Sequence, residues 1–534
     1  MKQIWLSLLP TGRQPITLSV FSCIVSIATL LLYNIPFFSY VAHNSHATAG
    51  GRILLVASLV IIMLALNFMM TYLLMFLTRL VGRIVLAVLS LINATAVYFV
   101  LTYSVIIDLT TIENVFNTRY SEASGFFCWS LWLFIILFGI LPAIYCLLRP
   151  VVFGKAKRLV INCGTSLAVI LAVALLNFNQ TLWVSQHDTE LGGLLQPWSY
   201  LANTVRMISS NNDKQAEEIK LPDGKILDNE KTVVVLVIGE SARKANFQLY
   251  GYGRDTNPLL SRQAELKVYQ ATSCATFTTA GSKAILEPKN TDELYEVLPN
   301  YVFRTGVDVS WRTSNWGEPP IHVDEYLTDT QLGELYPGEN TLYDGILMKG
   351  LRQRIESSPN NKVLIVLHTS TSHGPNYAEK YPKDFEVYRP VAKNVEEGEK
   401  HVDRLVNAYD NTIRYTDFLL DSLINTLRSM ADWHSAMIFI SDHGESLGEN
   451  KVFMHGLPMR LAPRVQYEIP FLVWISDNFR RYKPTSILQN APKGQLPAVL
   501  EQHYIFHSVL NLLSIHSPAY NSDYDIFEAS NEGE

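Results

Sequence analysis

The sequence predicts a helical membrane domain followed by an α/β domain whose mainly parallel sheet lies between two layers of helices. Five apolar runs of about 20 residues or more fill the first third of the 534-residue chain. Three β-branched runs begin at residues 232, 361 and 435, and such runs are typical of strands buried on both faces. Residues 402–430 carry apolar side chains at helical spacing between the last two runs, so strands and helices alternate.

The five apolar runs are predicted to be membrane-spanning helices. They cover residues 16–38, 53–78, 84–107, 126–148 and 159–178, and each can cross a bilayer of about 30 Å. None contains Asp, Glu, Lys or Arg, which argues against a transporter, because ion and substrate pathways usually need such residues. The first run is longer than a signal-peptide core and lacks a convincing cleavage site, so we expect it to be retained.

Basic residues near the ends of these runs predict the orientation. They precede the first run and fill the second and fourth connections, whereas the first and third connections each hold a single arginine, Arg52 and Arg119. Because Lys and Arg stay in the cytoplasm, we expect the N-terminus inside and everything after residue 180 outside. The residues on the inner side are Lys2, Arg13, Arg79, Arg83, Arg149, Lys155, Lys157 and Arg158.

Three regions follow from this pattern: a membrane domain at 1–180, a membrane-surface segment and linker at 181–231, and an outer domain at 232–534. Aromatic residues and leucines mix over 180–208, which fits a segment at the membrane surface or an ordinary connecting helix equally well. The polar stretch after it reads as a linker. Cys274 stands alone in the outer domain, so no internal disulfide forms there, although about 300 residues bury a sufficient core without one.

Each predicted strand is followed by residues that can bind a metal. Glu240 ends "TVVVLVIGE", His373 follows "KVLIVLHTSTS", and Asp442 with His443 follows "SAMIFIS". The carboxyl ends of parallel strands lie along one edge of a sheet, where ligands bind. Glu240, Asp442 and His443 therefore offer oxygen and nitrogen ligands for a catalytic divalent metal, most naturally zinc. His455 in "VFMHGLP" is a further candidate.

The segment "ATSCATFTTAGSK" at 271–283 offers hydroxyls for such a metal to activate. Coordination lowers the pKa of a hydroxyl enough for attack on phosphorus, and a helix starting here would present its amides to a phosphoryl oxygen. Composition does not choose among the hydroxyls, and an ordinary Ser/Thr-rich loop has the same pattern. The candidates are Ser273, Thr276, Thr278, Thr279 and Ser282.

Taken together, the motifs resemble the membrane-bound phosphoethanolamine transferases of Gram-negative bacteria, of the lipid A type, in the alkaline phosphatase and sulfatase superfamily. After the five apolar runs come "GESARKANFQLYGYGRDTNP", "TSCATFT", "SHGPNYAEKYP", "YDNTIRYTD" and "SDHGESLGE", in the family's order. The resemblance covers nearly the whole chain. It implies a bacterial inner-membrane, multi-pass protein whose alkaline phosphatase-like catalytic domain lies in the periplasm.

The resemblance also implies a catalytic centre. Glu240, Asp442 and His443 match the family's zinc ligands, and Thr278 matches its nucleophile, which also contacts the metal. One catalytic Zn²⁺ is expected, with a second zinc open and Mn²⁺ less favoured.

Substrate-binding residues follow from the same resemblance. His373 and His455 match histidines on the substrate side of the metal, which bind phosphate or a second zinc, and Asn315 matches an asparagine of the ethanolamine-phosphate pocket. A lysine sometimes found four places later is Pro319 here. The usual disulfide partner of Cys274 is Ala284, which puts the rigidity of the nucleophile loop in doubt.

The implied activity is transfer of phosphoethanolamine from phosphatidylethanolamine to a lipopolysaccharide acceptor, with lipid A phosphate favoured, through a threonine intermediate. This makes the cell surface less negative and implies polymyxin resistance. Membrane lipids are expected partners, the protein is expected to be a monomer, and no nucleic-acid partner is expected.

Four other functions remain to be weighed. Phosphoglycerol transferases share the architecture and act on glycan or lipid acceptors, and phosphoethanolamine transfer to a core sugar, a glucan or a protein is a further alternative. A sulfatase would need x-Pro-x-Arg after its modified residue, but Ala-Thr-Phe-Thr follows Cys274. A non-enzymatic membrane sensor would leave the convergence of Glu240, Thr278, Asp442 and His443 unexplained.

Overall fold

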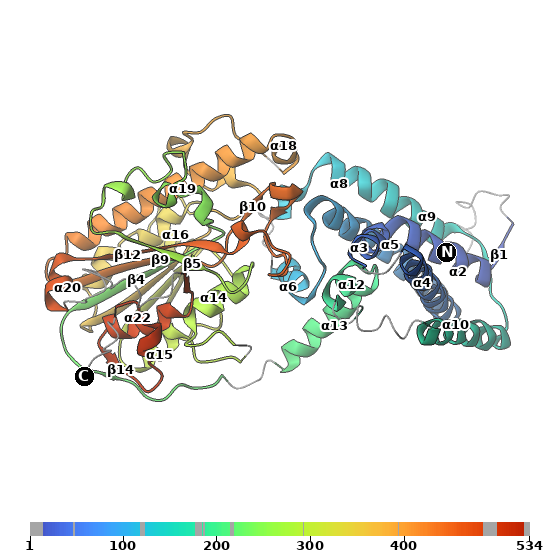
Figure 1. The fold of residues 1–534 in the computed structure, drawn as a ribbon, viewed down its shortest axis with the longest axis horizontal. Coiled ribbons are helices and arrows are strands. Elements are labelled where there is room, and N and C mark those ends of the chain that lie inside the picture. Colours follow the sequence, from blue (N-terminus) through green and yellow to red (C-terminus); the bar gives the residue numbers. More distant parts are fainter. Residues whose placement is uncertain are drawn as a thin grey trace. The chain divides into compact units, whose positions relative to one another are not determined.

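The structure is a computed structural model that describes residues 14–45, 49–117, 123–176, 184, 187–213, 218–291, 293–393, 395–483 and 499–527 (Figure 1). The chain divides into two compact units, one of residues 1–116 with 127–212 and the other of residues 117–126 with 213–534. Lys2, Arg13 and Arg119, used above for orientation, lie outside the described residues, as does Trp183, one of the aromatic residues of the predicted membrane-surface segment.

The first unit is built from apolar helices. Four are long and apolar enough to cross a membrane, and the bent pair α2 (Leu18–Tyr33) and α3 (Ile35–Asn44) makes a fifth if the pair counts as one span. The described residues therefore hold four or five spans where the sequence predicts five. The four are α4 (Ala49–Thr78), α5 (Leu80–Tyr103), the rod from α8 to α9 (Trp129–Leu148) and α10 (Ala156–Leu176).

A buried asparagine accompanies the 60° bend between α2 and α3. Asn34 accepts a hydrogen bond from the Gln196 backbone nitrogen at 2.9 Å and donates to the Gln196 carbonyl oxygen at 3.0 Å. Pro36 in the first turn of α3 removes a backbone donor at the same place. A buried side-chain amide needs hydrogen-bond partners, and Asn34 finds them in the backbone of Gln196. The bend between α2 and α3 and the position of residue 196 therefore depend on each other.

The segment after the last apolar helix packs on the same unit. α12 (Asp188–Leu194) and α13 (Trp198–Asp213) follow in the chain. Trp198 donates to Asn67 Oδ1 and Tyr200 donates to Asn93 Oδ1, each at 3.0 Å. These contacts join α13 to α4 and α5.

An eight-stranded sheet organises the second unit, in the order β13-β5-β12-β9-β4-β8-β6-β7. β12 is antiparallel to both β5 and β9, and the other pairs are parallel, so the predicted mainly parallel sheet is confirmed. In chain order the strands are β4 (Thr232–Gly239), β5 (Lys267–Thr272), β6 (Asp308–Thr313), β7 (Glu325–Thr328), β8 (Lys362–His368), β9 (His434–Ser441), β12 (Glu468–Ile475) and β13 (Leu500–Glu501).

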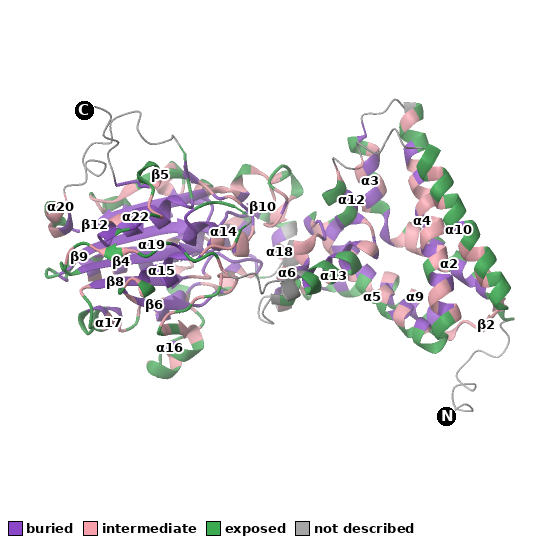
Figure 2. Ribbon diagram, turned by 90° about the horizontal axis from the view of Figure 1, so that it is seen from below, coloured by how far each residue is buried: buried purple, intermediate pink, exposed green. Residues whose placement is uncertain are grey.

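Helices cover both faces of this sheet, whose strands are buried between them (Figure 2). One core contains α14 (Thr278–Leu286), α15 (Leu298–Arg304) and α22 (Tyr504–Leu512), and the other contains α17 (Leu351–Glu356) and α19 (Val402–Arg428). Alternate residues of β4 enter opposite cores, which explains why the whole strand is apolar. Smaller elements are β3 (Lys225–Ile226), α16 (Asp329–Leu335), α18 (Val395–Lys400), β10 (Ser446–Leu447), β11 (Phe453–Met454), α20 (Asp477–Tyr482) and β14 (Ile515–His516).

Strand register determines where the candidate ligands lie. Gly239, the last residue of β4, pairs with Ser441, the last residue of β9, and Ile238 pairs with His368 at the end of β8. Glu240 and Asp442 therefore leave the sheet at adjacent positions. The edge formed by the carboxyl ends of these parallel strands is where open α/β sheets place their ligands.

Candidate metal centre

The structure brings Glu240, Asp442 and His443 together in a buried group at this edge. All three side chains are almost completely buried, and one oxygen or nitrogen from each lies within 4.8 Å of the others. Backbone amides hold the aspartate, because Asp442 Oδ1 accepts from Ser241 N at 3.0 Å and from His443 N at 2.6 Å. Ser241 Oγ donates to Glu240 Oε1 at 2.6 Å. The carboxylates are thus oriented by the turns that follow their own strands.

The imidazole of His443 has its tautomer set by the backbone. Its Nδ1 lies 2.8 Å from the Gly444 carbonyl oxygen, which can accept a hydrogen bond but cannot donate one. Nδ1 therefore carries the hydrogen, and the lone pair of Nε2 points into the group. Burial lowers the pKa of His443 to about 3, with His455 adding to the effect, so the ring is neutral at physiological pH.

The separations among the ligand atoms suit a small tetrahedral cation. His443 Nε2 lies 3.3 Å from Asp442 Oδ2, 3.4 Å from Glu240 Oε1 and 3.3 Å from Thr278 Oγ1. Ligands of tetrahedral zinc at bond lengths of 2.0–2.2 Å are about 3.3–3.6 Å apart. Nitrogen and carboxylate oxygen are also ligand types that zinc accepts.

The ionisation of the two carboxyl groups reflects their crowding. Burial raises the pKa of Asp442 well above its usual range, and the neighbouring Glu240 carboxylate raises it further. Burial also raises the pKa of Glu240, but the imidazoles of His443, His373 and His455 outweigh it and bring that pKa below its usual value. Asp442 Oδ2 is buried without a hydrogen-bond partner among the described residues. A divalent cation would satisfy this oxygen, so the residues fit a metal.

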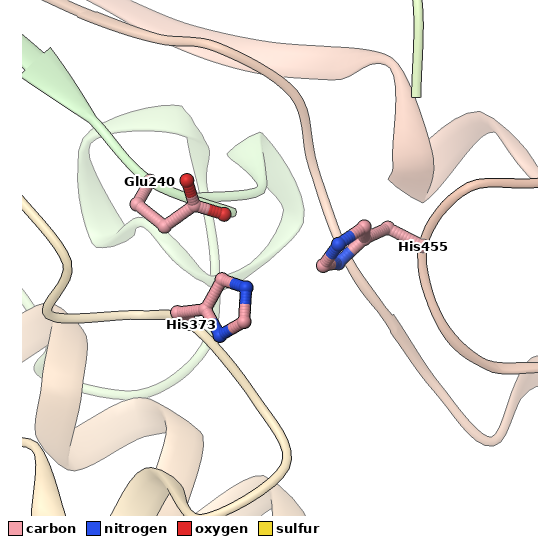
Figure 3. Close-up of side chains that lie close together, drawn as sticks. All are labelled: Glu240, His373 and His455. Carbon is pink, nitrogen blue, oxygen red and sulfur yellow. The ribbon is translucent and has the colours of Figure 1, made fainter. Parts of the chain in front are cut away.

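A second group of ligand atoms shares Glu240. The side chains of Glu240, His373 and His455 converge from three segments that are distant in sequence, with their ligand atoms within 4.8 Å of one another (Figure 3). The ring centroids of His455 and His443 are 4.3 Å apart. His373 is buried and its Nδ1 has no hydrogen-bond partner among the described residues. The predicted substrate-side histidines therefore lie directly beside the metal centre.

Among the candidate hydroxyls, the structure singles out Thr278. Its Oγ1 donates to Glu240 Oε2 at 3.2 Å and lies 3.3 Å from His443 Nε2. Ser273 and Thr276 donate instead to carbonyl oxygens, those of Ala275 and Leu457, each at 2.6 Å. Thr278 is also the first residue of α14, so its hydroxyl lies beside backbone amides that face the site.

Hydrogen bonds hold the nucleophile loop without a disulfide. All five cysteines are free, and Ala284 occupies the place of the expected partner of Cys274. Cys274 N donates to Gln502 Oε1 at 3.1 Å, and Thr276 exchanges two bonds with the loop of His455: Gly456 N donates to its carbonyl oxygen at 2.8 Å and its own Oγ1 donates to Leu457 O. The loop is therefore tied on two sides.

Two glycines allow other segments to approach the nucleophile. A Cβ on Gly281 would lie 2.3 Å from the carbonyl oxygen of Asp442, so α14 contacts the backbone of a ligand. Gly317 has φ +93°, which glycine adopts without strain, and a Cβ there would lie 3.3 Å from the methyl groups of Thr278 and Thr279. These close approaches place Thr278 relative to Asp442.

Asn315 has a position that the sequence pattern did not predict. Its Nδ2 donates to Glu240 Oε2 at 2.7 Å and lies 3.2 Å from His368 Nε2. The sequence analysis proposed no role for His368 or Ser241. Their positions at or just after the ends of predicted strands could have marked both as candidate site residues.

The fold and the site define a membrane-anchored enzyme of the alkaline phosphatase and sulfatase superfamily. A family model described as "Sulfatase" matches residues 232–515, and one described as "Phosphoethanolamine transferase EptA/EptB" matches residues 62–211.

Comparisons with individual proteins make the assignment more specific. "Phosphoethanolamine transferase EptA" of Helicobacter pylori is 35% identical over 515 residues, 94% of this chain and 95% of that protein. The protein of the same name from Salmonella typhimurium is 30% identical over 479 residues, 84% of this chain and 85% of that protein. The solved structure of EptA from Neisseria meningitidis matches with a TM-score of 0.84 and 23% identity, covering 96% of this chain and 99% of that one. The chain belongs to the phosphoethanolamine transferase family, which confirms the resemblance drawn from its motifs.

Replacing Gly281 with alanine should separate the nucleophile from the metal ligands. The new methyl group would meet the Asp442 carbonyl oxygen and displace α14, carrying Thr278 with it. Because misplacement by about 1 Å costs roughly 10²-fold in rate, transferase activity should fall at least about 100-fold. Activity is measured on purified protein in detergent, with Gly253→Ala as the control, since nothing lies within 4 Å of a Cβ there. Equal activity in Gly281→Ala and wild type would contradict the packing argument.

Proposed function

We propose that the protein transfers phosphoethanolamine from phosphatidylethanolamine to a phosphate of lipid A, through a covalent intermediate on Thr278. The observation that carries this proposal is the position of the Thr278 hydroxyl, within 3.3 Å of both Glu240 and His443 at the start of a helix. A hydroxyl placed among metal ligands and helix amides is equipped to attack phosphorus.

Zinc is the metal that the ligand set suits best. Glu240, Asp442, His443 and Thr278 would hold it, and His373 with His455 would either bind the phosphorylated substrate or hold a second ion. When bound, zinc would supply positive charge that lowers the pKa of the Thr278 hydroxyl and offsets the charge of the phosphoryl oxygens. The mixture of imidazole and carboxylate favours zinc over manganese, which prefers oxygen ligands.

The chain's own residues account for the two chemical steps. In the first, Thr278 Oγ1 attacks the donor phosphorus, the bond from phosphorus to the glycerol oxygen breaks, and diacylglycerol leaves with a proton. Glu240 Oε2, which already accepts from Thr278, orients the hydroxyl. In the second step a phosphate oxygen of the acceptor attacks the same phosphorus, the bond to Thr278 breaks, and Oγ1 takes up a proton that restores the hydroxyl. The α14 amides face the phosphoryl oxygens throughout.

The lipid A acceptor is supported by the relatives. "Kdo(2)-lipid A phosphoethanolamine 7''-transferase" of Salmonella typhimurium is also similar, at 29% identity over 264 residues that make up 47% of this chain, so a Kdo sugar is the second candidate acceptor. The EptA relatives cover far more of the chain, although their names specify no acceptor. A lipid A phosphate remains our first choice because of the motif resemblance. Its phosphomonoester carries about −1.5 to −2 charges at neutral pH, and adding phosphoethanolamine, which bears a positive ammonium, makes the net charge less negative.

The first prediction concerns the intermediate. Thr278→Ala should lower turnover by at least about 10³-fold, because it removes the hydroxyl that lies between Glu240 Oε2 and His443 Nε2. Thr279→Ala, which removes the neighbouring hydroxyl, should stay within about 3-fold of wild type. Incubation of wild type with the donor alone should add phosphoethanolamine to Thr278, as measured by intact mass and peptide mapping.

Two results of that experiment would contradict the proposal. An adduct on Thr279 or Ser282 would show that the wrong hydroxyl was chosen. A phosphoglycerol adduct, formed with phosphatidylglycerol and not with phosphatidylethanolamine, would instead support the phosphoglycerol transferase alternative.

The second prediction concerns the acceptor. Cells that express wild type should carry phosphoethanolamine on lipid A and tolerate polymyxin better, because a less negative surface binds cationic peptides more weakly. Glu240→Ala should abolish both effects. Glu230→Ala is the matched control, since it removes an exposed carboxylate just before the same strand. Mass spectra of lipid A are the measurement, and phosphoethanolamine found only on a core sugar or glucan would reject the lipid A acceptor.

The third prediction concerns topology. We place the protein in the inner membrane with five spans, residues 1–15 in the cytoplasm and the domain at 232–534 in the periplasm, where it meets the head groups of its lipid substrates. An alkaline phosphatase reporter joined after residue 230 should be active, and one joined at Val81, in the second connection, should be inactive. The reverse pattern would overturn the orientation.

A further inference from the structure

A pair of side chains, Glu318 and His368, is linked to the candidate metal centre through Asn315. His368 ends β8 and is fully buried, and Glu318 follows β6 with its side chain 9% exposed. His368 Nδ1 lies 3.3 Å from Glu318 Oε2. Neither residue has a role in the mechanism above.

Asn315 connects this pair to Glu240. Three acceptors surround its amide nitrogen: Glu240 Oε2 at 2.7 Å, the Thr369 carbonyl oxygen at 3.0 Å and His368 Nε2 at 3.2 Å. The amide has only donors at this nitrogen, so His368 Nε2 faces it as a lone pair. The hydrogen of the His368 ring then resides on Nδ1, which faces the carboxylate of Glu318.

The surroundings of Glu318 keep it a carboxylate. Burial raises its pKa, but the contacts with His368 and Tyr326 outweigh this and bring the pKa below its usual value. Tyr326 OH donates to Oε1, whereas Oε2 has no fully formed hydrogen bond among the described residues. The Nδ1 hydrogen of His368 is therefore the donor within reach of a buried oxygen that needs one.

We infer that Glu318 and His368 are positioning residues that act on the metal centre through Asn315. Glu318 holds the ring hydrogen of His368 on Nδ1, the free Nε2 holds the Asn315 amide, and the amide fixes the rotation of the Glu240 carboxylate. The order is Glu318, His368, Asn315, Glu240; the last three are buried, and the side chain of Glu318 is 9% exposed. This inference rests on the proposed function, because it assumes that Glu240 binds the metal.

The backbone explains why Glu318 reaches His368. Asn315 and Glu318 are three residues apart, and Gly317 between them has φ +93°, which turns the chain back toward β8. The same turn packs against the methyl groups of Thr278 and Thr279. One short loop thus orients a metal ligand and contacts the residue that carries the nucleophile.

The consequence concerns metal affinity. Partners that orient a metal ligand from outside its coordination shell commonly change affinity about 10–100-fold when they are removed. Without Glu318, the ring hydrogen of His368 is no longer held on Nδ1. If it moves to Nε2, two donors face each other and the Asn315 amide must rotate away from Glu240.

The test uses the full-length protein in detergent micelles and measures zinc affinity by competition with a chromophoric chelator. Glu318→Ala should bind zinc about 10–100-fold more weakly than wild type. Glu318→Gln keeps an acceptor for the Nδ1 hydrogen and should recover most of that loss. The control is Asp308→Asn, which alters a mostly buried carboxylate paired with Arg354 at the opposite end of β6 and should stay within about 3-fold.

Each other outcome has a definite meaning. If wild type binds no zinc, the proposed metal fails and this inference fails with it. If wild type binds zinc and Glu318→Ala binds it equally well, only the role of Glu318 and His368 is overturned. Equal losses in Glu318→Ala and Asp308→Asn would indicate general destabilisation, and equal losses in the Ala and Gln variants would show that the acceptor is not what matters. Both results would overturn the inference.

Discussion

The pairing of β4 with β9 brings the buried carboxyl groups of Glu240 and Asp442 next to each other. Gly239 and Ser441 are register partners, so the next residues, Glu240 and Asp442, emerge side by side with no room to separate. Burial raises the pKa of Asp442, and repulsion from the neighbouring Glu240 carboxylate raises it further. The ring of His443 turns the lone pair of its Nε2 toward these two carboxyl groups. Hydrogen bonds from Ser241 and from the His443 backbone nitrogen hold the two carboxyl groups in an arrangement that fits a cation.

The position of Thr278, the proposed nucleophile, depends on the same pair of strands. α14 approaches Asp442 so closely that only glycine fits at position 281, and this contact sets the distance from Thr278 to the ligands. The missing disulfide leaves the loop before α14 supported by Gln502 and by the exchange between Thr276 and residues 456–457. His455 immediately precedes residues 456–457. These hydrogen bonds therefore hold the loop before α14 and the loop of His455 together.

Local patterns were enough to predict much of the fold and little of its fine arrangement. The strands starting at 232, 362 and 434 and the helix at 402–428 follow from β-branched runs and helical spacing, which do not depend on distant residues. The bend at Asn34 could not be predicted, because its partner Gln196 lies 162 positions away. For the same reason, composition left the choice of hydroxyl open, and only the family motif pointed to Thr278. Asn315 was assigned to a substrate pocket, and its bond to Glu240 emerges only when β6 and β4 are placed in one sheet with β8 between them.

On the proposed mechanism, one phosphorus must meet two very different partners at the same place. The donor releases a neutral diacylglycerol, which needs a proton, whereas the acceptor brings a phosphate that already carries negative charge. Fixed cations would favour the second partner, and fixed carboxylates would repel it. The histidines at 373 and 455 suit both partners, since a neutral imidazole offers one hydrogen-bond donor and one acceptor. Their ligand atoms converge with that of Glu240, which also belongs to the group at the strand ends. On this mechanism the residues at the strand ends would bind the metal, and the two histidines from the loops would bind the substrates.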